Sequence, residues 1–165
     1  MKKVFLISFL VLAADQALKF WVKTHMYLGE KIPVTSWFDL HFVENPGMAF
    51  GMEFGGEAGK LLLTLFRIVV SVLLLWLIRN LTRRHASATL VIPLTLIFAG
   101  AVGNIIDSMF YGLVFNDPAV GVATFLPEGG GDAPLLHGKV VDMFYFHFWQ
   151  GDLPQWLPIW GGEPF

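Results

Sequence analysis

The sequence predicts a mainly α-helical, polytopic membrane protein with a small β element outside the membrane. Hydrophobic residues make up 55% of the 165 residues and charged residues only 15%. The mean hydropathy of +0.62 is well above that of soluble domains. Three apolar runs of about 18 to 19 residues are long enough to cross a hydrocarbon core roughly 30 Å thick. Because the length corresponds to one domain, we expect residues 1–165 to form a single membrane-embedded unit.

The composition also excludes several classes of protein. The net charge is −2 and no segment offers a basic face to phosphates, which argues against a nucleic-acid partner. The absence of cysteine removes disulfides, thiolate metal sites and a cysteine nucleophile. Any chemistry must therefore use carboxylates, amides, hydroxyls or histidines.

The first apolar run covers residues 4–22 and follows Lys2 and Lys3. It has the basic start and small-residue end of a signal peptide, but it is also long enough for a transmembrane span. We favour the span because two further apolar runs follow. Asp15 and Lys19 lie at i and i+4, so they meet on one helix face and neutralise each other.

Residues 23–60 form a more polar segment. Apolar and polar residues alternate over residues 37–43, which predicts a short strand or hairpin arm bounded by Pro33 and by a turn at Asn45. The glycines of residues 47–59 predict an irregular loop. Asn45 is therefore either an ordinary turn residue or a functional one.

The second apolar run, residues 61–78, contains one charged residue, Arg67, which lies near enough to its end to snorkel. The third run, residues 88–106, ends with Gly100 and Gly103, which predict a smooth face for close helix approach. Both runs are expected to span the membrane.

Asn104 and Asp107 lie at i and i+3 and project from one side of the third run near its end. They either bond to a neighbouring helix and mark the interface, or belong to a site. Beyond them, Pro and Gly residues predict loops over residues 111–139, and the tryptophans of residues 149–160 are typical of a segment at a membrane interface.

Asp142 is the one carboxylate within residues 137–149, a run that is otherwise mostly apolar and aromatic. An ionised carboxylate in a low-dielectric setting costs several kcal/mol or shifts its pKa until it is neutral, so it needs a partner or a reaction. Asp142 therefore either closes a turn, pairs with Lys139, or takes part in chemistry.

The charge pattern predicts an orientation. Basic residues without acids occur in the N-terminal tail and in residues 79–87, and such segments stay in the cytoplasm. The N-terminus is then inside, residues 23–60 form an outer loop, and residues 107–165 form an outer loop and an interfacial segment. Ionisable groups at membrane depth indicate a functional site. Six polar residues reach one level near the outer surface: Asp15, Lys19, Asn45, Asn104, Asp107 and Asp142.

Four motifs, in order, resemble those of the lipoprotein signal peptidases (signal peptidase II), a family of membrane-embedded aspartyl proteases. Residues 15–19, DQALK, resemble D-Q-x-x-K, and residues 44–50, ENPGMAF, resemble E-N-x-G-x-A-F. Residues 100–107, GAVGNIID, resemble the motif that ends the third helix, and residues 140–142, VVD, resemble V-V-D-F. Each motif is weak alone, but four in this order are specific.

The resemblance implies hydrolysis of the peptide bond just before the lipid-modified cysteine of a prolipoprotein. The partners would be diacylglyceryl-modified prolipoprotein signal peptides and the lipid bilayer. The enzyme would be a monomer in the bacterial cytoplasmic (inner) membrane, with its active site on the outer face. Asp142 would be one of two catalytic carboxylates that share a proton. The residues expected to bind substrate or support the site, without a metal or a cofactor, are Asp15, Lys19, Asn45, Asn104 and Asp107.

The chain departs from the family pattern in three places. Ser108 stands where the family has arginine, and residues 113–138 are an insertion in a link that is normally short. The second catalytic aspartate of the family belongs to an N-x-A-D motif that opens a fourth helix, and nothing after Asp142 matches it. We therefore expect a fragment of the enzyme, with a fourth span beyond residue 165.

Two alternatives stay open. A non-enzymatic membrane assembly or scaffold protein would use the same polar residues only to hold its helices together. Alternatively, Asp107 and Asp142 form a complete catalytic dyad without a fourth helix.

Overall fold

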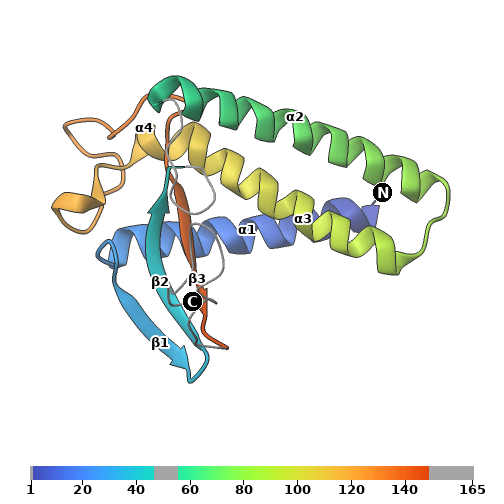
Figure 1. Cartoon of the computed structure of the whole chain (residues 1–165), viewed down its shortest axis with the longest axis horizontal. Coiled ribbons are helices and arrows are strands. Elements are labelled where there is room, and N and C mark those ends of the chain that lie inside the picture. Colours follow the sequence, from blue (N-terminus) through green and yellow to red (C-terminus); the bar gives the residue numbers. More distant parts are fainter. Residues whose placement is uncertain (1, 47–55, 149–165) are drawn as a thin grey trace, which may run out of the picture.

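Residues 2–46 and 56–148 are described by the computed structural model of the chain (Figure 1). The long helices are α1 (Lys2–His25), α2 (Gly56–Arg83) and α3 (Ala88–Ile106). The short helical segments are a π-helical turn η2 (Asp107–Tyr111), α4 (Gly112–Val114) and a 3-10 turn η3 (Pro118–Val120). The strands are β1 (Lys31–Thr35), β2 (Phe38–Asn45) and β3 (Val140–Phe146).

The three predicted spans are confirmed as helices long and apolar enough to cross a membrane. α3 coincides with the third predicted run, and its apolar stretch continues to Val114. α1 and α2 extend beyond their predicted runs, because polar residues at helix ends continue the backbone hydrogen bonding that the apolar part begins. The loop predicted around Gly59 is therefore wrong from Gly56 onward, where α2 begins, and residues 47–55 lie outside the described residues.

α3 packs against both α1 and α2 (Figure 1). Gly103 lies directly against the carboxylate of Asp15, and a side chain at this position would collide with it, so the predicted close approach is confirmed. Nothing lies within 4 Å of the position that a side chain would take at Gly100, so the second predicted contact is wrong. Gly100 instead leaves space beside α3.

The sheet is antiparallel, with the strand order β1-β2-β3. The predicted short strand is confirmed as β2, which continues through Asn45 rather than turning there. β1, which was not predicted, pairs with it as a hairpin, and Pro33 lies inside β1 rather than bounding the strand. An edge strand tolerates proline because its outward-facing N–H groups have no ladder partner. β3, which contains Asp142, corrects the prediction that residues 107–165 contain only loops and an interfacial segment.

The sheet lies beside the C-terminal end of α1 (Figure 1). An apolar core fixes it there. Val22 and Met26 of α1 pack with Phe42, Val141 and Met143 of the sheet, and each of these side chains is at most 4% exposed. Because Val141 and Met143 point into this core, Asp142 between them points to the opposite face of β3.

Candidate functional site

Lys19 is the centre of a buried polar network between α1 and α3. Its side chain is 4% exposed. The ammonium group donates to Asn104 Oδ1 at 2.9 Å and to Asp107 Oδ2 at 2.7 Å. It also lies 3.4 Å from Asp15 Oδ2, as the i and i+4 spacing predicted. Three acceptors thus surround the three donors of the ammonium group, which is what a buried lysine requires.

Asp107 ties the end of α3 to both α1 and β3. Its side chain is fully buried and, besides Lys19, it accepts hydrogen bonds from Gln16 Nε2 at 3.0 Å and from the Val141 N–H at 3.2 Å. The Val141 contact positions the backbone directly before Asp142. A carboxylate enclosed in this way has no access to water or substrate, which argues against a dyad of Asp107 and Asp142.

Gly138 allows the segment that leads into β3 to approach η2 this closely. Its N–H donates to the Ser108 carbonyl at 2.9 Å, and a side chain at Gly138 would collide with the Asp107 carbonyl oxygen. Ser108 itself is only 3% exposed. The position at which the motif has arginine is therefore packed inside the fold of this chain.

Asp142 is exposed and faces a cleft of about 420 Å³. Asn45 of β2 donates from Nδ2 to Asp142 Oδ2 at 3.0 Å, so these two predicted residues meet across the sheet. The cleft lies between the sheet and the helices α1 and α3, and its lining residues are Asp15, Lys19, Gly100, Asn104, Val141, Asp142, Met143 and Phe144. Asp107 and Asn45 contact this lining, so all six predicted residues lie together.

A second set of charged side chains lies on the face of β2 and β3 opposite to Asp142. Glu44 has a side chain that is only 3% exposed, and it forms ion pairs with Lys23 of α1 and with Lys139, the latter at 3.3 Å. Lys139 also lies 4.0 Å from Asp132 of the insertion. The sequence raised Lys139 as a partner of Asp142, but the structure pairs it with these two carboxylates instead. The insertion is thereby fastened to the strand that carries Asn45.

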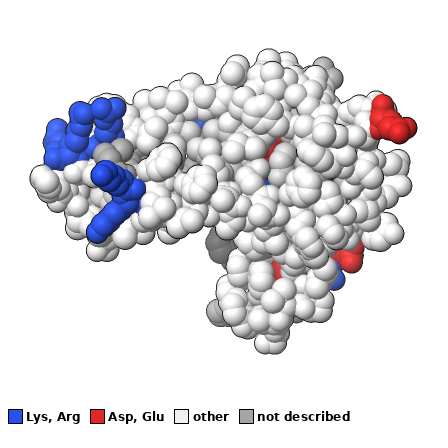
Figure 2. Space-filling model, turned by 180° about the vertical axis from the view of Figure 1, so that it is seen from behind, with Lys and Arg blue, Asp and Glu red and all other residues white. Residues whose placement is uncertain are grey.

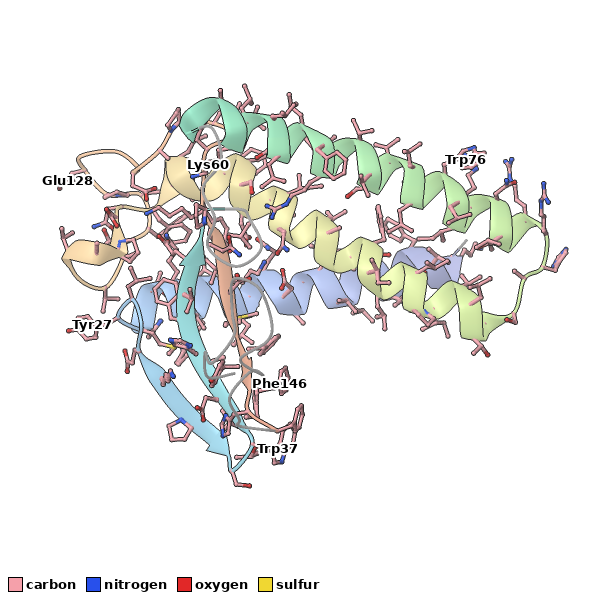
Figure 3. The ribbon with its side chains drawn as sticks, viewed as in Figure 1. Tyr27, Trp37, Lys60, Trp76, Glu128 and Phe146 are labelled. Atoms are coloured by element: carbon pink, nitrogen blue, oxygen red, sulfur yellow. The ribbon has the colours of Figure 1, made fainter. Side chains whose placement is uncertain are left out.

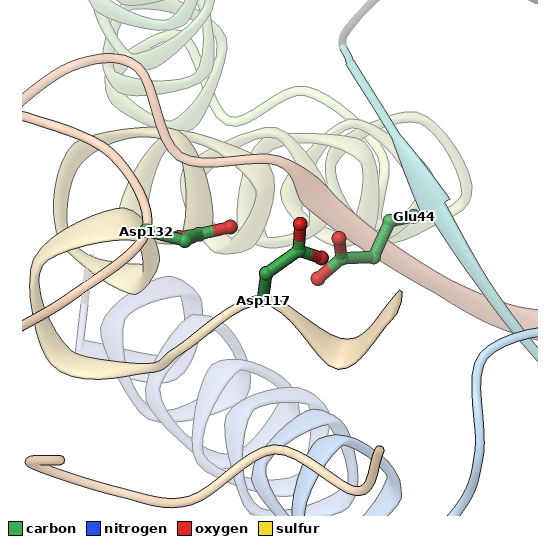
Figure 4. Close-up of side chains that lie close together, drawn as sticks. All are labelled: Glu44, Asp117 and Asp132. Carbon is green, nitrogen blue, oxygen red and sulfur yellow. The ribbon is translucent and has the colours of Figure 1, made fainter. Parts of the chain in front are cut away.

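The same charges include a group of carboxylates that resembles a metal site. Ligand oxygens of Glu44, Asp117 and Asp132 lie within 4.8 Å of one another (Figure 4). Hard divalent cations take such oxygen ligands, but the ammonium groups of Lys23 and Lys139 already pair with Glu44 and would repel a cation. The donor set therefore fits an ion-pair network better than a metal centre.

The ion pairs around Glu44 shift the pKa values of Asp132 and Lys139. Burial raises the pKa of Asp132, and the charges of Glu44 and Asp117 raise it further against the opposing effect of the two lysines. Burial alone would lower the pKa of Lys139, but the neighbouring carboxylates, above all Glu44, outweigh it and raise this pKa. Lys139 therefore stays protonated at neutral pH, where it holds Glu44.

Arg67 of α2 has a position that the sequence prediction missed. It was expected to snorkel from the end of the second span, but its Nη1 atom is buried and the residue lines a cavity of about 180 Å³ together with Asn104. Arg67 thus lies beside a predicted site residue. A single charge inside an apolar run was the signal for this placement.

The fold and the cleft define a polytopic membrane protein with a carboxylate site near one end of its helix bundle. Two solved structures, both described as bacterial membrane enzymes, share the fold with TM-scores of 0.60 and 0.58. They are 22% and 23% identical to this chain, and the alignments cover 93% of it and 76% and 80% of the two structures.

The chain belongs to the signal peptidase II family, because the family model described as signal peptidase (SPase) II matches residues 7–160. The lipoprotein signal peptidase of Porphyromonas gingivalis is 50% identical over 157 residues, which cover 94% of this chain and 68% of that protein. The protein of the same name from Amoebophilus asiaticus is 37% identical over 162 residues, which cover 94% of this chain and 64% of that protein. The resemblance indicated by the four motifs is therefore confirmed.

Proposed function

We propose that this chain acts as a lipoprotein signal peptidase, which cleaves a bacterial prolipoprotein just before its diacylglyceryl-modified cysteine. Membership of the signal peptidase II family supports a peptidase, and the relatives named lipoprotein signal peptidase support this substrate. The observation that carries the proposal is the exposed carboxylate of Asp142 in a cleft beside membrane-spanning helices.

The proposed mechanism is that of an aspartic endopeptidase. Asp142 takes a proton from water as the water oxygen bonds to the scissile carbonyl carbon, and a second carboxyl group protonates the carbonyl oxygen to give a gem-diol. The C–N bond then breaks, the leaving amine nitrogen receives the proton held by Asp142, and the second carboxylate takes a proton back from one hydroxyl group of the gem-diol. Asp107 is fully buried, and Asp15 is held by Gln16 at 3.1 Å and Lys19 at 3.4 Å. The second carboxyl group is therefore proposed to come from outside the described part of the chain. Two carboxyl groups suffice for this chemistry, so the proposal includes no metal or cofactor.

The other predicted residues are proposed to support this reaction. Asp15 and Asn104 line the cleft, where they are placed to contact a bound peptide, and the buried Lys19 braces both of them. Asn45 orients the Asp142 carboxylate through its hydrogen bond, and Asp107 holds the strand that carries Asp142. The protein is proposed to act as a monomer, since all of these groups come from one chain.

We place the N-terminus and the turn between α2 and α3 in the cytoplasm, and the site on the outer face of the bacterial inner membrane. Lys and Arg side chains gather at the end of the bundle that is distant from the sheet (Figure 2). Short basic segments remain on the cytoplasmic side. The exposed basic residues at this end are Lys2, Lys3, Arg79, Arg83 and Arg84.

The orientation is tested with single cysteines, since the chain has none of its own. Glu128, exposed in the insertion (Figure 3), and Ser87, exposed before α3, are suitable positions. An impermeant thiol reagent applied to intact cells is expected to label Glu128→Cys and not Ser87→Cys, and to label both after permeabilisation. The opposite pattern would place the site in the cytoplasm.

The function is tested in a bacterium depleted of its own lipoprotein signal peptidase. Expression of the protein encoded by the complete gene is expected to convert accumulated prolipoprotein to the mature form, seen as a mobility shift. Mass spectrometry of the product should place the cut directly before the modified cysteine. If the protein inserts into the membrane but leaves the precursor intact, the scaffold alternative would replace the peptidase.

A further inference from the structure

The outer part of the sheet exposes aromatic side chains on one face. We call Trp37, Phe38, Phe144, Phe146 and Phe148 the aromatic face. Its rings stack with centroid distances of 5.2 Å for Trp37 and Phe148, 4.9 Å for Phe38 and Phe146, and 5.6 Å for Phe146 and Phe148. Even so, Trp37, Phe144, Phe146 and Phe148 are between 45% and 73% exposed. A contiguous apolar surface of this kind indicates an interaction site.

The opposite face of the same strands is polar. The Asp39 carboxylate lies 3.7 Å from His147, and the Lys31 ammonium lies 4.7 Å from the centre of the Tyr145 ring. His41 meets the same tyrosine edge-on. Since Asp39 pairs with Tyr145 and Phe38 with Phe146, adjacent positions point to opposite faces. The sheet is therefore amphipathic.

The aromatic face points in the direction in which the long helices extend. Asp142 and Phe144 share one face of β3 because they are two residues apart, and both line the cleft beside α1 and α3. In Figure 3, Trp37 and Phe146 lie on the side of the sheet toward which the long helices extend, whereas Tyr27, just after α1, lies on the other side. The aromatic face thus continues the apolar surface that the membrane-spanning helices expose, for example at Phe9, which is 59% exposed.

Backbone hydrogen bonding determines how deep such a sheet can lie. β1 and β3 are edge strands among the described residues, and unpaired N–H and C=O groups are not tolerated in the hydrocarbon core. The interface, where water and headgroups reach the backbone, accepts such edges and is also where aromatic side chains are enriched. We propose that the aromatic face rests on the lipid bilayer at the interface of the leaflet nearest the site, with the polar face turned to water. This placement holds whether or not Asp142 is catalytic.

Two neighbouring positions of β3 provide a matched test. Phe146 and Tyr145 are 51% and 43% exposed and point to opposite faces. The protein with Phe146→Cys or Tyr145→Cys would carry an NBD fluorophore on the introduced cysteine, in vesicles of phosphatidylethanolamine and phosphatidylglycerol. Doxyl-labelled lipid is expected to quench the probe at 146 severalfold more than the probe at 145. Aqueous iodide should show the reverse order.

Two results would overturn the proposal. Equal quenching of both probes by iodide would place the aromatic face in water, and protection of the probe at 146 from both quenchers would show that protein covers it. Phe148→Cys provides a second measurement on the same face, because Phe148 is 73% exposed and lies beyond the end of β3. The probe at 148 tests the contact with lipid independently if the substitution of Phe146 disturbs its contact with Phe38.

Discussion

Asp142→Asn is expected to lower prolipoprotein cleavage by at least about 10²–10⁴-fold, the usual contribution of one positioned acid or base. Asparagine keeps the size of the side chain and still accepts the hydrogen bond that Asn45 donates at 3.0 Å. It cannot take a proton from water at neutral pH. Because Asp142 is exposed, the substitution should leave folding and membrane insertion unchanged. Cleavage would be measured with purified full-length protein in lipid nanodiscs.

Asp39→Asn is the matched control for this substitution. Asp39 is a carboxylate on the same sheet, but it lies on the polar face beside His147 and away from the cleft. We expect the Asp39→Asn protein to cleave prolipoprotein at close to the wild-type rate. If Asp142→Asn also cleaves at the wild-type rate, Asp142 is a structural residue, and the aspartic mechanism would have to be abandoned.

Hydropathy and helix spacing predicted the features that are local in the sequence. The three spans follow from apolar runs alone, and the ion pair of Asp15 and Lys19 follows from their i and i+4 spacing on α1. To predict that Asn104 and Asp107 lie against α1 required one further assumption, namely that the membrane sets the depth of each polar group. Because a bilayer fixes this depth, residues far apart in sequence could be grouped before any contact was known.

The strand β3 was harder to predict because both of its faces carry apolar residues. Val141 and Met143 face the core, whereas Phe144 and Phe146 lie on exposed positions, so the alternation of apolar and polar residues that marks a half-buried strand is lost. If the aromatic face rests on lipid, this explains why β3 lacks the alternation of apolar and polar residues. One face of the strand then meets the protein core and the other meets the bilayer, and both are apolar.

The ion pairs of Glu44 were also beyond sequence reasoning. Lys23, Lys139 and Asp132 lie on three separate segments, and only the packing of the insertion against β2 brings them to Glu44. Charges on loops have no periodicity that predicts their partners. Arg67 was missed for a related reason, because its position in a span is visible in the sequence but the direction of its side chain toward the site is not.

Lys19→Met is expected to destabilise the folded protein by roughly 3–5 kcal/mol, the usual cost of removing one partner from a buried ion pair. Methionine fills a similar volume, so lost packing contributes little. The cost arises because Asp107 would stay fully buried with only Gln16 and the Val141 N–H to compensate its charge. The free energy of unfolding would be measured by titrating the protein from mild detergent into SDS and following its near-UV circular dichroism.

Two further variants separate the loss of charge compensation from other effects. Lys31→Met makes the same change at an exposed lysine of β1 and should cost little, since surface substitutions are usually worth less than about 0.5 kcal/mol. Adding Asp107→Asn to Lys19→Met should restore much of the lost stability, because an amide can accept the Val141 hydrogen bond without carrying a charge. If the double variant is no more stable than Lys19→Met alone, the buried charge of Asp107 is not the cause of the loss, and Lys19 would stabilise the bundle chiefly through Asn104 and Asp15.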